Sequence, residues 1–241
     1  MSDYRESHAD ATYGARYLRT YSQGYYSGLW GQVEKPLLEE LLEKPEIRKG
    51  SALDFACGTG RISEVLCSHF GQVLGVDVSL SMLEQVPALP NLTTKNIDLT
   101  ADTLHLQVDL VTAFRFFLNA QPKLRTAALT VIKSSLLRGG HLIVNVHMVD
   151  SSPMGRLYSF LRRLGFKSVH KTMSRREMRE LLENEGFEVI GEYPYGFLPR
   201  LGRVSPRLSE RLVGRYERIA KKIGAPPAAA HNLIFLAQKP F

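Results

Sequence analysis

Hydrophobic and polar positions alternate along the chain in a pattern that predicts short strands separated by helices. Apolar residues recur at helical spacing from Val33 to Leu42, which predicts a helix that ends before the turn at Lys49-Gly50. From Ser51 onward the apolar runs become short. Strands are expected at Ala52–Phe55, Val73–Val76, Leu92–Asn96, Leu110–Ala113, Leu142–Val146, Phe187–Tyr193 and Asn232–Gln238. Helices are expected at Arg61–Phe70, Leu80–Gln85, Lys123–Leu137 and Ser174–Glu185.

Two local signals fix helix ends in this pattern. Ser174 and Glu177 have capping-box spacing, so a helix is expected to begin there and to stop at Gly186. The Gly139-Gly140 pair is expected to stop the preceding helix and lead into the fifth strand. Because strands and helices alternate, we predict an α/β fold whose parallel sheet is covered by helices on both faces.

Length and composition exclude several classes of protein. The chain has 241 residues, 44% hydrophobic and 23% charged, which is ordinary for a globular protein and excludes a fibrous or disordered one. It contains no apolar run of about 18 residues, the length that a membrane-spanning helix needs, and its start does not have the pattern of a signal peptide. The two cysteines, Cys57 and Cys67, are expected to be reduced thiols in a cytoplasmic protein.

The positive charge is concentrated near the C-terminus. The chain has a net charge of +7, and the segment from Gly196 to Lys222 holds eight basic and two acidic residues. If residues 207–223 form a helix, a basic stripe lies beside an apolar stripe. Either the apolar stripe packs on the sheet, or the basic stripe binds an anionic partner. The basic and apolar stretch Met154–Lys171 could add to such a surface.

A glycine turn follows the first expected strand, and acidic residues end three successive strands. The turn, with Gly58 and Gly60, lets a ligand approach the backbone closely. Asp54 precedes the turn, Asp77 ends the second strand and Asp98 follows the third. Carboxylates at these places would repel a pyrophosphate, but they suit an ammonium group, ribose hydroxyls and an adenine amino group. The pattern therefore favours a cationic nucleoside without phosphates over a dinucleotide.

Three segments resemble successive motifs of the class I S-adenosylmethionine-dependent methyltransferases. The segments are Asp54–Arg61, Gly75–Leu83 and Asp109–Asn119. The resemblance implies a doubly wound, mostly parallel, seven-stranded Rossmann-like sheet with an antiparallel last strand. It also implies an N-terminal helical cap (residues 1–50), a cofactor-binding core (51–149) and a part that completes the sheet (150–241), with the basic insertion 196–230 as a substrate cap.

The same resemblance implies which residues bind S-adenosylmethionine. Ala56 departs from the family, which often has glycine there, and we expect it to keep a negative φ. The implied cofactor-binding residues are Asp54, Ala56, Gly58, Gly60, Arg61, Asp77, Val78, Met82, Ile97, Asp98, Ala113 and Phe114.

Residues near the ends of the later strands are candidates for the chemistry. His147 follows the fifth strand and could remove a proton from the acceptor, or it could be a polar residue at a strand end. Arg115 and Asn119 could orient an acceptor oxygen or carboxylate. No group of residues has the spacing of a metal site. Aromatic residues expected to contact the acceptor are Tyr25, Trp30, Phe117, Tyr195 and Phe197.

We therefore expect methyl transfer to an oxygen, or less favourably a nitrogen, of a small and possibly anionic molecule. Three alternatives stay open at this point. The enzyme could act on a lipid-linked glycan or a quinone at an anionic membrane surface, bound through the basic C-terminal helix. It could methylate RNA, although the near-neutral core makes nucleic acid a weaker candidate. It could also bind the cofactor without catalysis.

Overall fold

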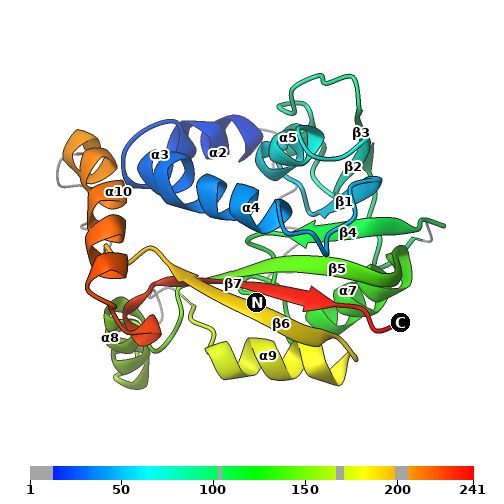
Figure 1. Ribbon diagram of the computed structural model, residues 1–241. Coiled ribbons are helices and arrows are strands. Elements are labelled where there is room, and N and C mark those ends of the chain that lie inside the picture. Colours follow the sequence, from blue (N-terminus) through cyan, green and yellow to red (C-terminus); the bar gives the residue numbers. More distant parts are fainter. Residues whose placement is uncertain (1–12, 103–104, 167–170, 199–205) are drawn as a thin grey trace.

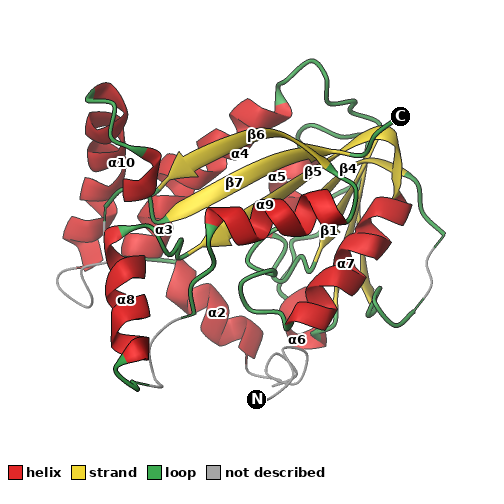
Figure 2. Cartoon of the chain, turned by 90° about the horizontal axis from the view of Figure 1, so that it is seen from below, coloured by secondary structure: helices red, strands yellow, loops and turns green. Residues whose placement is uncertain are grey.

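A seven-stranded sheet forms the centre of the computed structural model, which describes residues 13–102, 105–166, 171–198 and 206–241. The strand order is β3-β2-β1-β4-β5-β7-β6, and helices cover both faces (Figures 1 and 2). The strands are β1 (Ser51–Phe55), β2 (Gln72–Asp77), β3 (Leu92–Asn96), β4 (Val108–Ala113), β5 (Leu136–His147), β6 (Glu188–Tyr195) and β7 (Asn232–Gln238).

Strands β1 to β5 pair in parallel, and β7 is antiparallel to both β5 and β6. The predicted Rossmann-like sheet with its antiparallel last strand is therefore confirmed. The strand order reverses between β1 and β4, and ligands bind at the carboxyl ends of the strands beside such a reversal. The last strand runs the other way, so its first residues lie at this same edge.

Each face of the sheet is closed by its own group of helices. On one face, the apolar sides of α4 (Lys35–Leu42) and α5 (Arg61–Cys67) pack on the sheet. On the other face lie α7 (Pro122–Ser135) and α9 (Arg175–Asn184). A short helix, α6 (Leu80–Leu83), follows β2. The strands between these layers, β4 above all, are buried on both faces, as a parallel sheet requires.

The N-terminal part forms a helical cap above the carboxyl ends of the strands. It consists of α2 (Tyr13–Tyr21), α3 (Tyr25–Leu29) and a π-helical turn, η1 (Trp30–Glu34), that continues directly into α4. Helix α2 contacts α6, so the cap reaches across to the loop after β2. π-Helical turns are rare, and they occur frequently at functional sites.

The boundary between α7 and β5 differs from the prediction. The helix ends at Ser135, and β5 begins at Leu136 and runs through the two glycines, which do not stop the helix. Gly139 donates its N–H to the carbonyl of Lys239, and Lys239 donates to the carbonyl of Gly140. This pairing with the C-terminal segment extends the strand. Helices α5 and α6 are also shorter than predicted, whereas α9 begins as predicted, with Ser174 accepting the N–H of Glu177 at 2.8 Å.

Two further helices, one after β5 and one between β6 and β7, lie at one end of the molecule. They are α8 (Pro153–Arg163) and α10 (Pro206–Lys222), and a short 3-10 turn, η2 (Pro227–Ala229), leads from α10 to β7. Helix α10 packs mainly on α3 and η1, and its buried Val213 joins the apolar cluster on that face of the sheet. The apolar stripe, for which packing on the sheet was one of two alternatives, is largely exposed: Leu208, Tyr216 and Ile219 are each about half exposed. Among the described residues, no helix has the length and apolar character to cross a membrane.

Candidate cofactor and acceptor site

A cavity of about 280 Å³ lies at the carboxyl ends of the parallel strands, below the N-terminal cap. It brings together most of the predicted site residues, which come from the loops after β1, β2, β3 and β4, from the end of β5 and from the cap. The predicted residues that line it are Tyr25, Asp54, Ala56, Gly58, Arg61, Asp77, Val78, Met82, Ile97, Asp98, Phe114, Arg115, Asn119 and His147.

The carboxylate of Asp77 holds the glycine turn in place. One oxygen accepts the N–H of Gly58 and the other accepts the N–H of Ser79, both at 2.8 Å. Gly58 has a φ of 57°, and a Cβ added there would lie 3.0 Å from Cε of Met82. The turn therefore combines a left-handed backbone with a close approach, and glycine satisfies both. Carboxylate oxygens have further lone pairs, so Asp77 can also accept ribose hydroxyls.

Ala56 corrects one prediction. Its φ is 57°, in the left-handed region, although we expected a negative value for a residue with a Cβ. The loop from β1 into α5 requires this conformation, and alanine adopts it at an energetic cost that glycine would not have. Its methyl group lies on the cavity wall.

Asp54 is buried at the end of β1. It accepts hydrogen bonds from the hydroxyls of Ser63 and Thr112, at 2.6 and 2.8 Å. Burial raises the pKa of Asp54 to about 6, although both hydroxyls act in the opposite direction. A cation bound beside this carboxylate would favour its charged form.

Asp98 is ordered by the residue two places along the chain. Its Oδ1 accepts both the N–H and the hydroxyl of Thr100, at 2.9 and 2.6 Å. Ile97 and Asp98, which follow β3, line the cavity together with Val78 and Met82, which follow β2. The loops after these two strands thus bring three apolar side chains and one carboxylate to the same cavity.

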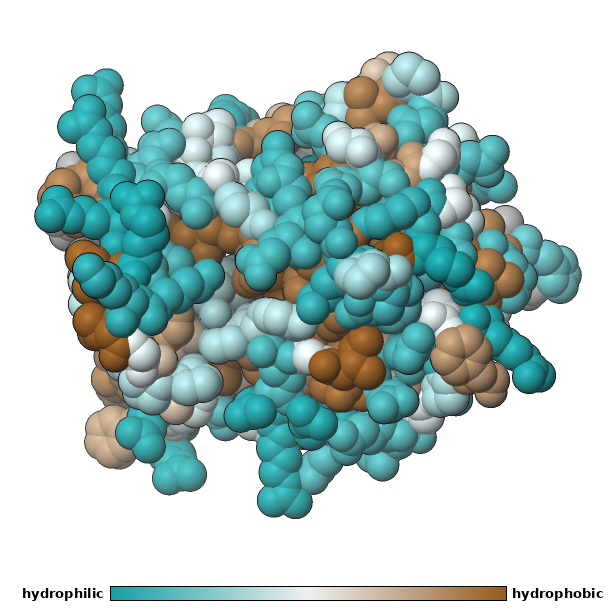
Figure 3. Space-filling model, viewed as in Figure 1, coloured by the Kyte–Doolittle hydropathy of each residue, from teal (hydrophilic) through white to brown (hydrophobic). Residues whose placement is uncertain are grey.

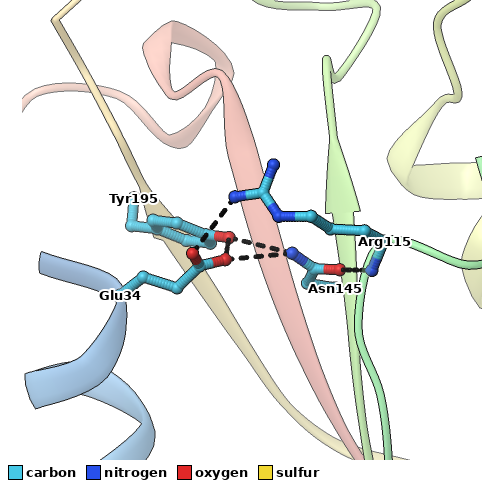
Figure 4. Close-up of polar contacts among 4 residues, drawn as sticks. All are labelled: Glu34, Arg115, Asn145 and Tyr195. Atoms are coloured by element: carbon cyan, nitrogen blue, oxygen red, sulfur yellow. Dashed lines mark hydrogen bonds and ion pairs between the residues drawn. The ribbon is translucent and has the colours of Figure 1, made fainter. Parts of the chain in front are cut away.

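A buried ion pair lies behind the cavity wall (Figure 4). Nη2 of Arg115 is 3.2 Å from Oε2 of Glu34, whose side chain is fully buried. Tyr195 donates its hydroxyl to Oε1 of Glu34 at 2.6 Å, and Asn145 donates its amide to the same oxygen at 3.1 Å. Burial alone would raise the pKa of Glu34, but Arg115, Arg61 and the Tyr195 hydroxyl together lower it.

The backbone of Arg115 is held as firmly as its side chain. Its φ is 59°, and its N–H donates to Oδ1 of Asn145 at 2.6 Å. Asn119, predicted to orient the acceptor, donates its amide to the carbonyl of Arg115 at 2.8 Å. A left-handed conformation is unfavourable for a long side chain, and such strain clusters at functional sites.

Tyrosines and two guanidinium groups form the upper wall of the cavity. The Arg61 guanidinium lies 4.6 Å from the ring centre of Tyr21 and 4.4 Å from that of Trp30, and the Arg115 guanidinium lies 5.1 Å from Tyr21. Nη1 of Arg61 and Nε of Arg115 are buried without a hydrogen-bond partner. Buried N–H groups of this kind are costly unless a ligand accepts from them.

Two histidines lie at the cavity from adjacent strands. His147 ends β5 and pairs in register with Asn232 at the start of β7, and His231 directly precedes that residue. Ser152 donates its hydroxyl to the carbonyl of Val149 at 2.7 Å, so His231 must donate from Nδ1 to Ser152 Oγ, at 3.1 Å. Nε2 of the neutral ring then carries the lone pair, and burial lowers the pKa of His231.

Several predicted residues do not reach the cavity. Phe117 is buried in the sheet core, and its neighbour Phe116 lines the wall instead. Tyr195 lies behind Arg115, and Phe197 packs with Ala220 and Ala230 near η2. Trp30, Gly60 and Ala113 also lie outside the lining, although Trp30 stacks on Arg61. Within the described part of the chain, no three His, Cys, Asp or Glu side chains are grouped to hold a metal ion.

The prediction from sequence missed Glu34 and His231. A signal existed for Glu34, since it occupies the same helical face as Leu37, Leu38 and Leu41, and an acidic residue on a buried face requires a partner. No comparable signal marks His231, because its position depends on the antiparallel pairing of β7. Tyr17, Tyr21 and Tyr26 of the tyrosine-rich N-terminal segment also line the cavity. Further lining residues that the prediction did not assign to the site are Thr100, Met148, Met154, Tyr158 and Asn232.

Residues 53–142 match a family model described as a methyltransferase domain. A search of curated proteins gave no match. Among solved structures, the chain resembles magnesium protoporphyrin IX methyltransferase from Synechocystis PCC 6803 with bound SAH. The TM-score is 0.67 at 16% identity, and the alignment covers 98% of this chain and 100% of that one.

Two further structures extend the comparison. Phosphoethanolamine N-methyltransferase 2 of Haemonchus contortus, in complex with S-adenosyl-L-methionine, has a TM-score of 0.64 at 17% identity. The alignment covers all of this chain and 61% of that one. The cyclase SpnF has a TM-score of 0.67 at 16% identity, with 99% and 97% covered. At such identities the likeness establishes the fold. Independently of the fold, the family model matches a methyltransferase domain at residues 53–142, in the centre of the chain.

Proposed function

We propose that this class I methyltransferase domain transfers a methyl group from S-adenosylmethionine to an oxygen of a small, anionic acceptor. The observation that carries the proposal is the placement of Asp54, Asp77 and Asp98 around one cavity, beside the left-handed turn at Gly58. Three carboxylates around a glycine turn suit a cationic nucleoside and disfavour a phosphate-bearing one. The arrangement supports binding of S-adenosylmethionine, and the match of residues 53–142 to a methyltransferase domain supports methyl transfer.

The cavity residues fit the parts of S-adenosylmethionine. Asp54 would hold the amino group of the methionine part, Asp77 the ribose hydroxyls, and Asp98 the adenine amino group. Val78, Met82 and Ile97 supply an apolar slot for the ring. When bound, the cofactor supplies an electrophilic methyl group on a sulfonium, so the protein contributes alignment, exclusion of water and removal of a proton.

The two guanidinium groups in the cavity wall support an anionic acceptor. Arg61 and Arg115 each carry a buried guanidinium nitrogen without a hydrogen-bond partner, and the ring of Tyr21 lies against both groups. A carboxylate or phosphate on the acceptor would accept hydrogen bonds from these nitrogens. The ion pair with Glu34 fixes the direction of Arg115, so the acceptor would be positioned by a group that does not have to reorganise.

A histidine would take the proton of the acceptor. Bound S-adenosylmethionine would supply the methyl group to the acceptor oxygen, with the carbon–sulfur electron pair left on sulfur. The hydroxyl proton of the acceptor would pass to Nε2 of His231, which carries a lone pair in the neutral ring, or to His147. Because burial lowers the pKa of His231, this ring is neutral and able to act as a base near pH 7.

The first experiment is calorimetric titration of the full chain with S-adenosylmethionine, S-adenosylhomocysteine and NADH. We expect the first two to bind and NADH to give no signal. The reverse pattern would overturn the assignment of the three carboxylates. Cell extracts are then incubated with methyl-labelled cofactor, and labelled products are compared between the native chain and Arg115→Lys, which keeps the charge but loses the planar guanidinium.

A second candidate is a reaction other than methyl transfer on the same cofactor-binding fold. The structural similarity to a cyclase favours it, because that fold therefore serves more than one reaction. Cofactor binding without a labelled product in any extract would support this candidate. The alternative acceptors, a lipid-linked glycan, a quinone or RNA, all depend on what binds the exposed basic face of α10.

A further inference from the structure

Helices α8 and α10 expose most of the large apolar side chains that the structure leaves in solvent. Twelve such side chains are exposed among the described residues, and eight of them lie on these helices or directly after them. Scattered exposed apolar residues are common, but a gathering of this kind marks an interaction surface. The eight residues, here called the apolar face, are Leu157, Phe160, Leu164, Phe166, Leu208, Tyr216, Ile219 and Ile223.

The apolar side chains of α10 cannot be buried by turning the helix, because its opposite side is already occupied. Val213, Gly214 and Ala220 are buried on that side. Glu217 accepts the N–H groups of Gly196 and Phe197 there, at 3.0 and 3.2 Å, which ties the helix to the segment after β6. The outward direction of the apolar face is therefore fixed by the fold.

Cationic side chains lie beside the apolar face along the whole of α10. They are Arg207, Arg211, Arg215, Arg218 and Lys222, all exposed, and none forms an ion pair with an acidic residue in the part of the chain that the structure describes. On a helical wheel, these cations occupy one arc and the exposed apolar residues the next. Figure 3 shows hydrophobic surface among hydrophilic side chains at the edge where α10 runs.

Helix α8 repeats this arrangement and also reaches the cavity. Leu157, Phe160 and Leu164 are exposed, with Arg156 and Arg163 beside them. Its other side contributes Met154 and Tyr158 to the cavity lining. Both ribbon views place α8 and α10 at the same end of the molecule (Figures 1 and 2). The two helices thus present one kind of surface, next to the wall of the site.

We propose that the exposed faces of α8 and α10 dock on an anionic phospholipid bilayer. A helix that lies in a membrane interface exposes an apolar stripe beside a basic stripe. Helix α10 has both stripes, and its remaining side packs on the protein. The apolar side chains enter the headgroup boundary, and the cations meet lipid phosphates. Exposed Leu and Ile side chains would gain nothing from RNA, which binds through basic and stacking groups. The docking does not depend on the proposed reaction.

The test is co-sedimentation of the full chain with two kinds of vesicle. One kind contains phosphatidylcholine alone, and the other contains about 30% phosphatidylglycerol. Two double variants probe the face: Arg211→Glu with Arg215→Glu for the charge, and Phe160→Ser with Ile219→Ser for the apolar part. Lys95→Glu with Lys123→Glu makes the same change of charge on exposed residues of β3 and α7, and Phe241→Ser removes an exposed apolar residue elsewhere.

We expect binding to anionic vesicles and not to neutral ones. The charge variant should weaken it by at least about 20-fold, because each basic residue near an anionic surface contributes about fivefold. The apolar variant should weaken it by about tenfold or more, and both controls should bind like the native chain. Absence of binding to anionic vesicles would overturn the proposal. The proposal would also be overturned if the control variants lost as much vesicle binding as the two test variants. Binding to a generic RNA that is the same in the native chain and the apolar variant would overturn it as well.

Discussion

Arg115 and Glu34 form a buried ion pair across 81 residues of sequence, with Nη2 of Arg115 3.2 Å from Oε2 of Glu34. The pair joins the π-helical turn of the N-terminal cap to the loop after β4. The ion pair therefore holds the N-terminal cap in a fixed position against the loop that lines the cavity. The geometry of the cavity wall at Arg115 therefore depends on Glu34, which does not itself line the cavity.

Replacing Glu34 should be costly to the fold. Glu34→Ala leaves the Arg115 guanidinium buried without its counter-charge and also removes the acceptor of the Tyr195 hydroxyl, so we expect a loss of about 3–5 kcal/mol. Chemical denaturation by urea measures it. Glu34→Gln keeps a hydrogen-bond acceptor and should lose less. Equal stability of the native chain and Glu34→Ala would show that the ion pair does not hold the cap.

The carboxylate of Asp77 should matter to the cofactor more than to the fold. Asp77→Ala removes the acceptor of the Gly58 and Ser79 N–H groups and of the proposed ribose hydroxyls. We expect cofactor binding to weaken by about 1.5–3 kcal/mol, the range for hydrogen bonds to a charged group. Titration calorimetry measures the change, and circular dichroism checks the fold. An unchanged dissociation constant would refute the placement of the ribose.

Cofactor binding should depend on pH through Asp54. The pKa of Asp54 is about 6 in the folded protein and 3.8 in its ordinary state, so the folded protein binds this proton more tightly than the unfolded chain does. The resulting contribution to the free energy of unfolding is complete below pH 3.8 and is lost as the pH rises through 6. The ammonium group of the cofactor needs the charged form. Affinity for S-adenosylhomocysteine should therefore rise about tenfold between pH 5 and pH 7. In Asp54→Asn this rise should disappear, and its persistence there would assign the titration to another group.

The core was predictable because its signals are local. Each acidic residue lies at or just after the end of its own predicted strand, so the strand pattern placed Asp54, Asp77 and Asp98 at one edge of the sheet. β7 was predicted to the residue, since a run of apolar residues flanked by polar ones fixes both of its ends. The alternation of strands and helices along the chain then predicts a parallel sheet that contains these strands.

The parts that escaped prediction depend on contacts between distant segments. Phe116 and Phe117 are neighbours, and only the register of the loop after β4 decides which ring lines the cavity. The sequence left open whether the apolar stripe of α10 faces the core, because α3 and η1, which pack on a different side of that helix, are distant in sequence. Ala56 shows that a loop set by the strand before it and the helix after it can override the preference of a residue for negative φ.

His231 should be needed for turnover and not for cofactor binding. If Nε2 of His231 takes the acceptor proton, His231→Gln should lower kcat by about 10²–10⁴-fold, with little change in the dissociation constant of the cofactor. The product found in the extract search provides the assay. His147→Gln, at the end of the adjacent strand, is the matched comparison, since only the variant of the true base should lose the acidic limb of the pH–rate profile. Full activity in both variants would exclude a histidine base.

Two glycines of the N-terminal cap should respond in opposite ways to the same substitution. A Cβ at Gly28 would lie 2.7 Å from the carbonyl oxygen of Glu210, so Gly28→Ala must push α10 away from α3. Glu210 also accepts the N–H of Gly24 and the hydroxyl of Ser27, each at 3.0 Å, and those bonds would be strained as well. We expect a loss of about 1–3 kcal/mol in urea unfolding.

Gly31 provides the control within the same run of helix. A Cβ there meets nothing within 4 Å, so Gly31→Ala adds no clash and restricts the unfolded chain. Stability should rise by about 0.5–1 kcal/mol. Gly28→Ala should also weaken binding to anionic vesicles if displacement of α10 disturbs the docking face, whereas Gly31→Ala should leave that binding unchanged. Equal stability of the two variants would mean that α3 and α10 do not pack as closely as the structure places them.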